Sequence, residues 1–67
     1  MAMFNQSEMQ LLIVLYRSGK PLPTKAIAEK AGMSWATAKK YLSMLYEKNV
    51  LDRARYKNAV YWWIKVE

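Results

Sequence analysis

Two groups of basic side chains in the second half of the chain have the chemistry to bind a polyanion. Lys39 and Lys40 are adjacent in a stretch that contains neither proline nor glycine. Arg53, Arg55 and Lys57 follow at intervals of two residues, a spacing that directs the side chains of an extended strand to one face. Ammonium and guanidinium groups donate hydrogen bonds to phosphate oxygens and to the acceptor atoms of guanine. The two groups therefore indicate a nucleic-acid partner.

Catalysis and metal binding find little support in the sequence. The chain contains no histidine and no cysteine, which are frequent general bases, nucleophiles and zinc ligands. Its carboxylates fall on different predicted elements, without the spacing of a catalytic pair or a metal site. They are Glu8, Glu29, Glu47, Asp52 and Glu67. We therefore predict that the chain is not an enzyme, holds no cofactor or metal, and has no evident small-molecule substrate.

The size and charge of the chain are consistent with this interpretation. Sixty-seven residues form at most one domain, whose core must come from aliphatic and aromatic packing because no disulfide is possible. Eleven Lys and Arg against five Asp and Glu give a net charge of +6, which favours polyanionic partners. A small basic protein that simply keeps a soluble surface is the alternative explanation of the charge.

Neither a membrane span nor a secretory signal is predicted. The longest apolar run, residues 11–16, has six residues, far fewer than the roughly 18 to 20 that a bilayer requires. The first residues lack a basic region followed by a long apolar stretch. Together with the absence of cysteine, this predicts an intracellular, cytoplasmic protein without membrane contact.

The basic side chains must be positioned by helices and strands, and the first predicted element is a helix that supports the core. Asn5 and Glu8 have the spacing of a capping box, and Gly19 followed by Pro21 supplies the end of the helix. Helical periodicity then predicts which side chains face the core. These are Met9, Leu12, Ile13 and Tyr16.

Two further helices are separated by a tight turn. Thr24 is the predicted N-cap of a short helix that ends at Ala31, and Gly32 is expected in the left-handed conformation. Ser34 is the predicted N-cap of a longer helix that runs to about Lys48. The predicted buried positions are Ile27, Ala28 and Ala31 in the short helix and Ala38, Leu42 and Leu45 in the longer one. The face opposite this stripe collects Ala36, Lys39, Lys40, Ser43 and Glu47.

After Asn49, which is expected to end the third helix, two antiparallel strands are predicted. Residues 50–55 and 60–66 are rich in β-branched and aromatic side chains. The four residues between them, 56–59, have the length of a hairpin connection, in which Asn58 best tolerates a positive φ. Alternation assigns Val60, Trp62, Ile64 and Val66 to the core. Tyr61 and Trp63 then face outward, and we hypothesise that they form a dimer surface with residues 1–4.

This order of elements resembles the winged helix-turn-helix domain, in particular that of small archaeal and bacterial transcription regulators. The resemblance rests on TKAIAEKAGMS at residues 24–34, TAKKYLSML at residues 37–45 and VYWWI at residues 60–64. It covers about residues 5–64 and implies a single α+β domain over residues 1–67. That domain would have three helices and a C-terminal antiparallel hairpin, the wing. It also implies a prokaryotic or viral source.

In that family the third helix enters the major groove of DNA and the wing touches the adjacent backbone or minor groove. The resemblance implies base-facing positions at Trp35, Ala36, Lys39, Lys40 and Ser43, and phosphate contacts at Ser34 and Thr37. It implies wing contacts at Arg53, Arg55, Lys57 and Asn58. Relatives that bind left-handed DNA carry an asparagine and a tyrosine on this helix. Lys39 and Ser43 stand at the aligned positions here, which disfavours that specialised function.

The resulting hypothesis is a transcription regulator that binds double-stranded DNA with sequence specificity, as a homodimer. The principal alternative is a winged helix that serves as a protein-interaction or assembly module without DNA binding. RNA binding is a third possibility, disfavoured because the chain lacks the aromatic platform motifs of single-strand readers.

Overall fold

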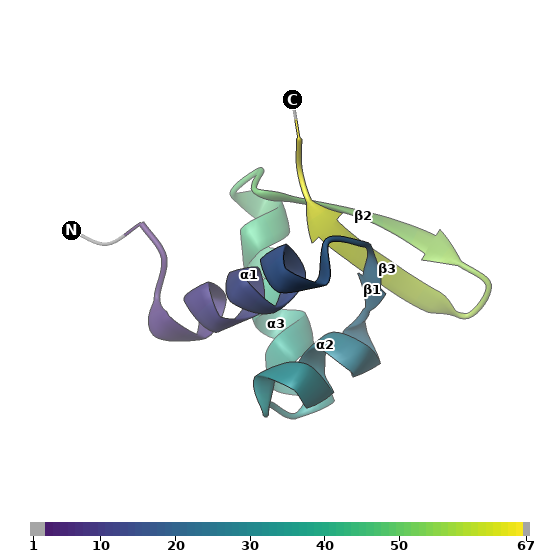
Figure 1. Ribbon diagram of the computed structural model, residues 1–67, viewed down its shortest axis with the longest axis horizontal. Helices are drawn as coiled ribbons and strands as arrows, with labels where there is room; N and C mark the ends of the chain where they lie inside the picture. The colour runs from purple at the N-terminus through teal and green to yellow at the C-terminus, as the bar shows by residue number, and fades with distance from the viewer. Residues whose placement is uncertain (1–2, 67) are drawn as a thin grey trace.

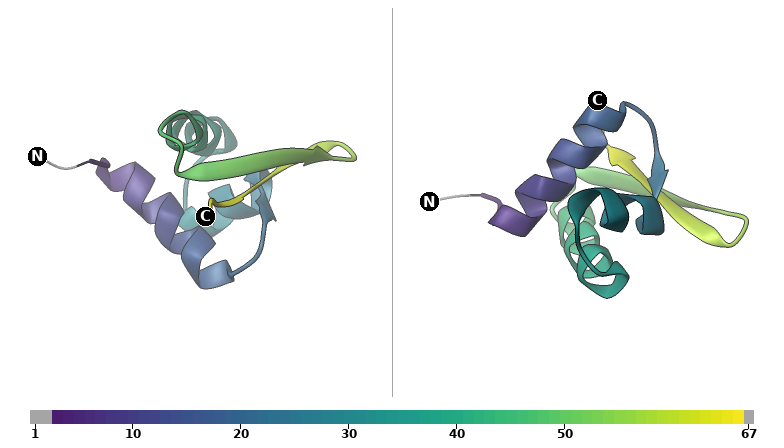
Figure 2. Two further views of the ribbon diagram at one scale, coloured as in Figure 1. Left: turned by 90° about the horizontal axis from the view of Figure 1, so that it is seen from above. Right: turned by 60° about the horizontal axis from the view of Figure 1, so that its bottom comes forward.

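The computed structural model describes residues 3–66 as three helices and a three-stranded sheet (Figure 1). In chain order the elements are α1 (Gln6–Ser18), β1 (Leu22–Pro23), α2 (Thr24–Ala31), α3 (Trp35–Glu47), β2 (Leu51–Tyr56) and β3 (Ala59–Ile64). The β2–β3 hairpin extends well beyond the helices, as all views show (Figures 1 and 2). This arrangement confirms the predicted α+β winged-helix architecture.

The ends of α1 and α3 are formed by the capping residues that the sequence predicts. The Asn5 side chain accepts a hydrogen bond from the Glu8 N–H at 2.8 Å, and the Asn5 N–H donates to Glu8 Oε1 at 2.9 Å. Ser34 Oγ accepts from the Thr37 N–H at 3.1 Å. Beyond α3, Asn49 has a φ of 68° and turns the chain toward β2. These local signals therefore define where the helices begin and end.

The predicted role of Thr24 as an N-cap is wrong. Pro23 occupies the N-cap position of α2 without a side-chain capping bond, and Thr24 is the first helical residue. The Thr24 hydroxyl instead accepts a hydrogen bond from Trp62 Nε1 at 2.8 Å. A buried indole N–H needs an acceptor, and Thr24 is the buried hydroxyl that supplies it. This bond joins the start of α2 to the centre of β3.

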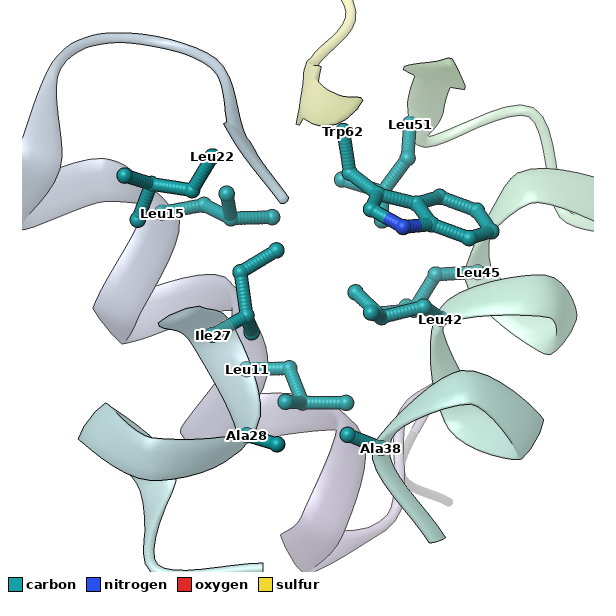
Figure 3. Packing of buried hydrophobic residues seen from close by; sticks show 10 residues of the cluster. All are labelled: Leu11, Leu15, Leu22, Ile27, Ala28, Ala38, Leu42, Leu45, Leu51 and Trp62. Carbon is teal, nitrogen blue, oxygen red and sulfur yellow. The ribbon is translucent and has the colours of Figure 1, made fainter. Parts of the chain in front are cut away.

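The core lies between the three helices and one face of the sheet. Figure 3 shows side chains of α1 and α2 facing those of α3, with Trp62 and Leu51 of the sheet closing one end. The predicted buried positions of α3 are confirmed, as are Ile27 and Ala28 of α2. The buried apolar residues are Leu11, Leu15, Leu22, Ile27, Ala28, Ala38, Leu42, Leu45, Leu51 and Trp62.

The predicted core face of α1 is largely wrong. Met9, Ile13 and Tyr16 are 45%, 47% and 79% exposed, whereas Leu11 and Leu15 are buried. Residues 11–16 are apolar without interruption, so both faces of this helix look like a core face and periodicity cannot choose between them. One apolar face of α1 therefore remains in solvent.

Glu8 explains in part which face of α1 turns inward. Its carboxylate is fully buried, and Lys48 Nζ donates to both of its oxygens at 2.9 Å and to the Met3 carbonyl at 3.1 Å. Burial raises the pKa of the Glu8 carboxyl, but the Asn5 N–H and the Lys48 ammonium together outweigh it. The pKa of Glu8 consequently lies below its usual 4.5. The ion pair ties the start of α1 to the end of α3.

The sheet contains a strand that was not predicted. β1 pairs antiparallel with β3, with Leu22 opposite Trp62 and Pro23 opposite Tyr61, which makes β3 the central strand. Two residues, one of them proline and both preceded by Pro21, carry no strand periodicity, so this element depends on the pairing itself. β1 brings the start of α2 against the base of the wing.

The hairpin turn is shorter than predicted. Tyr56 pairs with Ala59, which leaves Lys57 and Asn58 as a two-residue turn. The positive φ lies at Lys57, at 57°, and not at Asn58. The register of the strands determines which residue sits at the first turn position, and two-residue hairpin turns commonly require a positive φ there.

The predicted alternation along the last strand holds only within β3. Trp62 is buried, and Val60 and Ile64 pack against the core. Val66 is 87% exposed because it lies beyond the end of the strand. Trp63 lies beside Tyr16 near the C-terminal end of α1, whereas Phe4 lies under Lys48 near its N-terminal end. The hypothesised dimer surface of Tyr61, Trp63 and residues 1–4 stays a prediction, and residues 1 and 2 lie outside the described residues.

Candidate nucleic-acid interface

The polar face of α3 is turned to solvent, as predicted. Ala36, Lys39 and Lys40 are exposed, Ser43 is half-buried and Trp35 is 53% exposed. Buried Ala38, Leu42 and Leu45 on the opposite face anchor the helix to the core. The sequence pattern of α3 therefore leaves one small, basic strip available for a ligand.

The first turn of α3 exposes two hydroxyl groups and free backbone amides. Ser34 and Thr37 are both exposed, and the Ser34 hydroxyl donates to Thr37 Oγ1 at 2.9 Å while it accepts from the Thr37 N–H. The amides of Trp35 and Ala36, at the first helical positions, have no partner within the helix. Such amides carry partial positive charge and suit a phosphate oxygen.

A groove of about 400 Å³ separates α3 and the start of α2 from the wing. Five of the predicted site residues line it, namely Trp35, Lys39, Arg53, Arg55 and Asn58. Buried Trp62 and Thr24 also belong to its lining, so their hydrogen bond lies at the base of the groove. None of the lining residues is acidic. The groove thus gathers positive charge without a neutralising carboxylate.

Cross-strand pairing explains why the two arginines face the groove. Arg53 pairs with Trp62 and Arg55 with Val60, so both share the sheet face that carries the core. Beyond the helices the hairpin projects without a neighbouring element among residues 3–66 (Figure 2), and residues on this face line one side of the groove. The predicted common face is confirmed for these two residues. Lys57 departs from it because it lies in the turn, with Nζ 5.5 Å from the centre of the Tyr56 ring.

Arg53 packs against aromatic rings of two elements. Its guanidinium carbon lies 4.1 Å from the centre of the Tyr46 ring of α3 and 5.6 Å from that of Trp62. A stacked guanidinium keeps its N–H donors directed along its edges, where a phosphate can accept them. Arg53 therefore positions the wing against α3 as well as adding charge to the groove.

The two lysines of α3 are not equivalent. Lys39 lines the groove, and its Nζ lies 5.0 Å from the centre of the Trp35 ring. Lys40 lies outside the groove lining and leans toward Tyr41, at 5.4 Å. Ala36, Ser43 and Thr37 also lie outside that lining, on the exposed or half-exposed surface of α3. The structure thus joins only part of the predicted strip to the wing.

Lys25 is a groove residue that the sequence did not reveal. It lies in the first turn of α2, is exposed, and lines the groove together with Lys39 and the two arginines. Its position follows from the pairing of β1 with β3, which no local sequence pattern predicts. Lys25 raises the number of cations in the lining to four.

Within residues 3–66, no three potential metal-ligating side chains come together, and no helix is long and apolar enough to cross a membrane.

No protein-family model matches the sequence, and no curated protein matches it. Solved structures do. The AntR antimony-specific transcriptional repressor superposes with a TM-score of 0.83 and 29% identity, covering 92% of this chain and 55% of that one. The homodimeric winged helix-turn-helix DNA-binding domain of a possible ArsR-family regulator from Mycobacterium bovis gives 0.81 and 27%, covering 90% and 54%. This chain therefore spans a little over half the length of both.

A third similar structure is matched over nearly its whole length. The Zalpha domain of Carassius auratus PKZ, solved in complex with Z-DNA, superposes with a TM-score of 0.78 and covers 90% of this chain and 94% of its own. At 23% identity it shows a shared fold only. Together with the helices, the three-stranded sheet and the projecting hairpin described above, these similarities identify the chain as a winged helix-turn-helix domain.

Proposed function

We propose that this chain binds double-stranded DNA with sequence specificity and regulates transcription, with α3 in the major groove and the wing on the backbone or minor groove. The observation that carries the proposal is the groove between α3 and the wing, whose lining has four cations and no carboxylate. A helix fits the width of the major groove of B-form DNA, and phosphates complement the charge beside it. The regulators to which the chain is similar support the same function.

Within this proposal α3 supplies sequence preference. Lys39 and Lys40 donate to guanine acceptors or phosphates, while the small side chains of Ala36 and Ser43 permit close approach to base edges. Ser34, Thr37 and the first amides of α3 hold a phosphate, and Trp35 packs against a thymine methyl or the backbone. Because these groups share one exposed strip, α3 is the element that reads bases.

The wing supplies affinity in the same proposal. Arg53 and Arg55 face the groove, and Lys57 and Asn58 form the tip of the wing. Lys25 of α2 contributes a further phosphate contact. Contacts to phosphate carry no sequence information, so loss of a wing cation weakens binding to all sequences alike.

Selection of bound duplexes from a random pool, followed by two double variants, tests this division. Lys39→Ala/Lys40→Ala is expected to relax sequence preference, whereas Arg55→Ala/Lys57→Ala is expected to weaken all duplexes and reduce the slope of log affinity on log salt by about 2. Arg53 is left intact because its packing on Tyr46 would confound the result. Lys65→Ala, which removes one charge outside the groove lining, is the control and should change little. Negligible effects of both pairs would refute DNA binding and favour an acidic protein partner.

We infer that the chain acts as a homodimer through the apolar face of α1. Met9, Ile13 and Tyr16 are exposed along one side of this helix. Tyr16 also borders an open hollow of about 550 Å³, lined by apolar Trp63 and Val66 among others. Exposed apolar surface of this kind is typical of interfaces. The homodimeric Mycobacterium domain supports the inference.

A dimer would present two α3 helices to half-sites about one DNA turn, ~34 Å, apart. Ile13→Glu introduces a charge in the middle of the apolar face and is expected to convert a dimer to a monomer in sedimentation experiments. Gln10→Glu, an exposed position on α1 outside that face, is the matched control. A wild-type protein that sediments as a monomer with and without DNA would refute the dimer.

A further inference from the structure

A second group of cations lies away from α3 and the wing. It consists of Arg17 at the end of α1, Lys20 in the following loop and Lys30 near the end of α2. These three side chains border one open hollow of about 420 Å³. The remaining lining residues are Val14, Ser18 and Leu22. Three of the eleven basic residues thus converge from three separate segments on a hollow without an acidic lining residue.

The loop that carries Lys20 is held in place by the end of α1. Gly19 adopts a left-handed conformation, with φ 67°, and its N–H donates to the Leu15 carbonyl at 3.1 Å. The Ser18 hydroxyl donates to the Lys20 carbonyl at 3.1 Å. The backbone that presents Lys20 is therefore preorganised beside Arg17.

Within residues 3–66, none of the three basic side chains forms an ion pair with a carboxylate. The salt bridge found in that part of the chain joins Glu8, near the start of α1, to Lys48, just past the end of α3. The hollow lies at the other end of α1. Glu29 precedes Lys30, but successive residues of a helix point about 100° apart. Like charges around one hollow repel one another, and an anion between them would remove that repulsion.

The hollow is separate from the groove between α3 and the wing. The two share no lining residue. In the right-hand view of Figure 2, the C-terminal end of α1 and the first turn of α3 lie at opposite ends of the molecule, with α2 between them. A ligand held by α3 and the wing therefore does not fill the hollow.

We propose that the hollow is a second phosphate site, which takes a phosphodiester group of DNA outside the stretch that α3 and the wing contact. This proposal rests on the DNA-binding function proposed above. The Arg17 fork can hold two phosphate oxygens, and the two lysines act as point charges. The phosphate belongs either to the same duplex, curved toward α1, or to a second duplex. Its chemistry is the same in both cases.

The test compares duplexes of about one turn (~10 bp) and about two turns (~20 bp) by amide NMR and salt-dependent affinity. The variants are Arg17→Gln/Lys20→Gln/Lys30→Gln, which keeps much of the side-chain length, and Lys39→Ala/Lys40→Ala. Addition of the longer duplex is expected to shift the amide signals of Ser18 and Gly19, which are present in both proteins, in the wild type but not in the triple variant. The triple variant should bind the one-turn duplex as the wild type does. Unchanged thermal unfolding confirms that it is folded.

The salt dependence identifies the source of the phosphate. If the same duplex curves toward α1, the slope of log affinity on log salt for the two-turn duplex falls by about 2.7 in the triple variant, which is three cations at 0.9 each. If a second duplex binds, that slope is unchanged and the shifts appear only after the first equivalent of DNA. Equal shifts and equal slopes in the wild type and the triple variant would overturn the second site. Failure of the primary function shows separately, as unchanged sequence preference in Lys39→Ala/Lys40→Ala together with unchanged affinity in Arg55→Ala/Lys57→Ala.

Discussion

The two sides of this molecule differ in how they use exposed side chains. The groove side, formed by α3 and the wing, exposes cations and small polar groups around a lining without carboxylates. The α1 side exposes Met9, Ile13 and Tyr16 next to half-buried Trp63. Both α1 and α3 have 13 residues and one buried face, but α1 also exposes a row of large apolar side chains beside its exposed polar residues. Exposed apolar surface is typical of interfaces, which is why DNA is proposed for the groove side and a second copy of the chain for the α1 side.

The largest expected effect tests which face of α1 is structural. Leu11→Ala removes a fully buried side chain and should lower the free energy of unfolding by about 2 to 5 kcal/mol. Ile13→Ala, two residues away and half exposed, should change it by less than about 0.5 kcal/mol in the monomer. Urea unfolding of both variants measures the difference. Similar losses would mean that the exposed face of α1 is part of the core.

The ion pair that connects the two sides has the next largest expected effect. Glu8→Gln leaves Lys48 beside a neutral amide in a buried position, and should lower the free energy of unfolding by about 1 to 3 kcal/mol. Glu47→Gln removes an exposed carboxylate one residue before Lys48 and serves as control. A loss in Glu8→Gln no greater than in this control would show that the pair does not hold α1 to α3.

The same pair predicts how stability depends on pH. The pKa of Glu8 in the folded chain lies below its usual 4.5, so the folded state favours the ionised carboxylate. This contribution is present above about pH 4.5 and is lost as the pH falls through the lower folded value. Denaturant unfolding between about pH 7 and pH 3 should therefore show a steeper loss of stability in the wild type than in Glu8→Gln. Parallel curves would contradict the lowered pKa.

The groove side was more predictable than the α1 side for physical reasons. In α3 the lysines alternate with a strict apolar stripe, and Ser34 and Asn49 mark its ends, so local sequence determines its inner and outer faces. In α1 the run of six apolar residues satisfies several periodicities, and a partly buried ion pair between residues 40 apart in sequence helps to decide among them. Periodicity therefore predicts a buried face only where the opposite face is polar.

The site was predictable only as far as single elements extend. The common face of Arg53 and Arg55 follows from strand alternation, and the exposure of Lys39 follows from helical periodicity. The groove, the place of Lys25 and the stacking of Arg53 on Tyr46 depend on how distant segments pair. No local pattern carries that information.

An effect no larger than that of Glu8→Gln is expected at the Thr24–Trp62 hydrogen bond beneath the groove. Thr24→Val keeps the shape of the side chain but removes the acceptor of the buried Trp62 N–H. The free energy of unfolding should fall by about 1 to 3 kcal/mol, and by the lower figure if a water molecule replaces the hydroxyl as acceptor. Thr24→Ser keeps the acceptor and is the control. Thr24→Val should also weaken DNA binding without relaxing sequence preference, because this hydrogen bond positions the wing. Unchanged stability and DNA binding would show that the pairing of β1 with β3 positions the wing without the Thr24–Trp62 hydrogen bond.

The smallest expected effect lies at the tip of the wing and separates backbone strain from charge. Lys57 has a φ of 57°, a conformation that costs a side-chain-bearing residue about 1 kcal/mol and glycine almost nothing. Lys57→Gly and Lys57→Ala lose the same charge, so they should weaken DNA binding equally. The glycine variant should nevertheless be more stable than the alanine variant by about 1 kcal/mol in urea unfolding. That result would mean that the contribution of Lys57 to DNA binding comes from its charge and that its backbone conformation suits glycine better. Equal stability of the two variants would place the strain elsewhere in the turn. Unequal DNA binding would show that the backbone path of the wing, as well as its charge, determines its affinity for DNA.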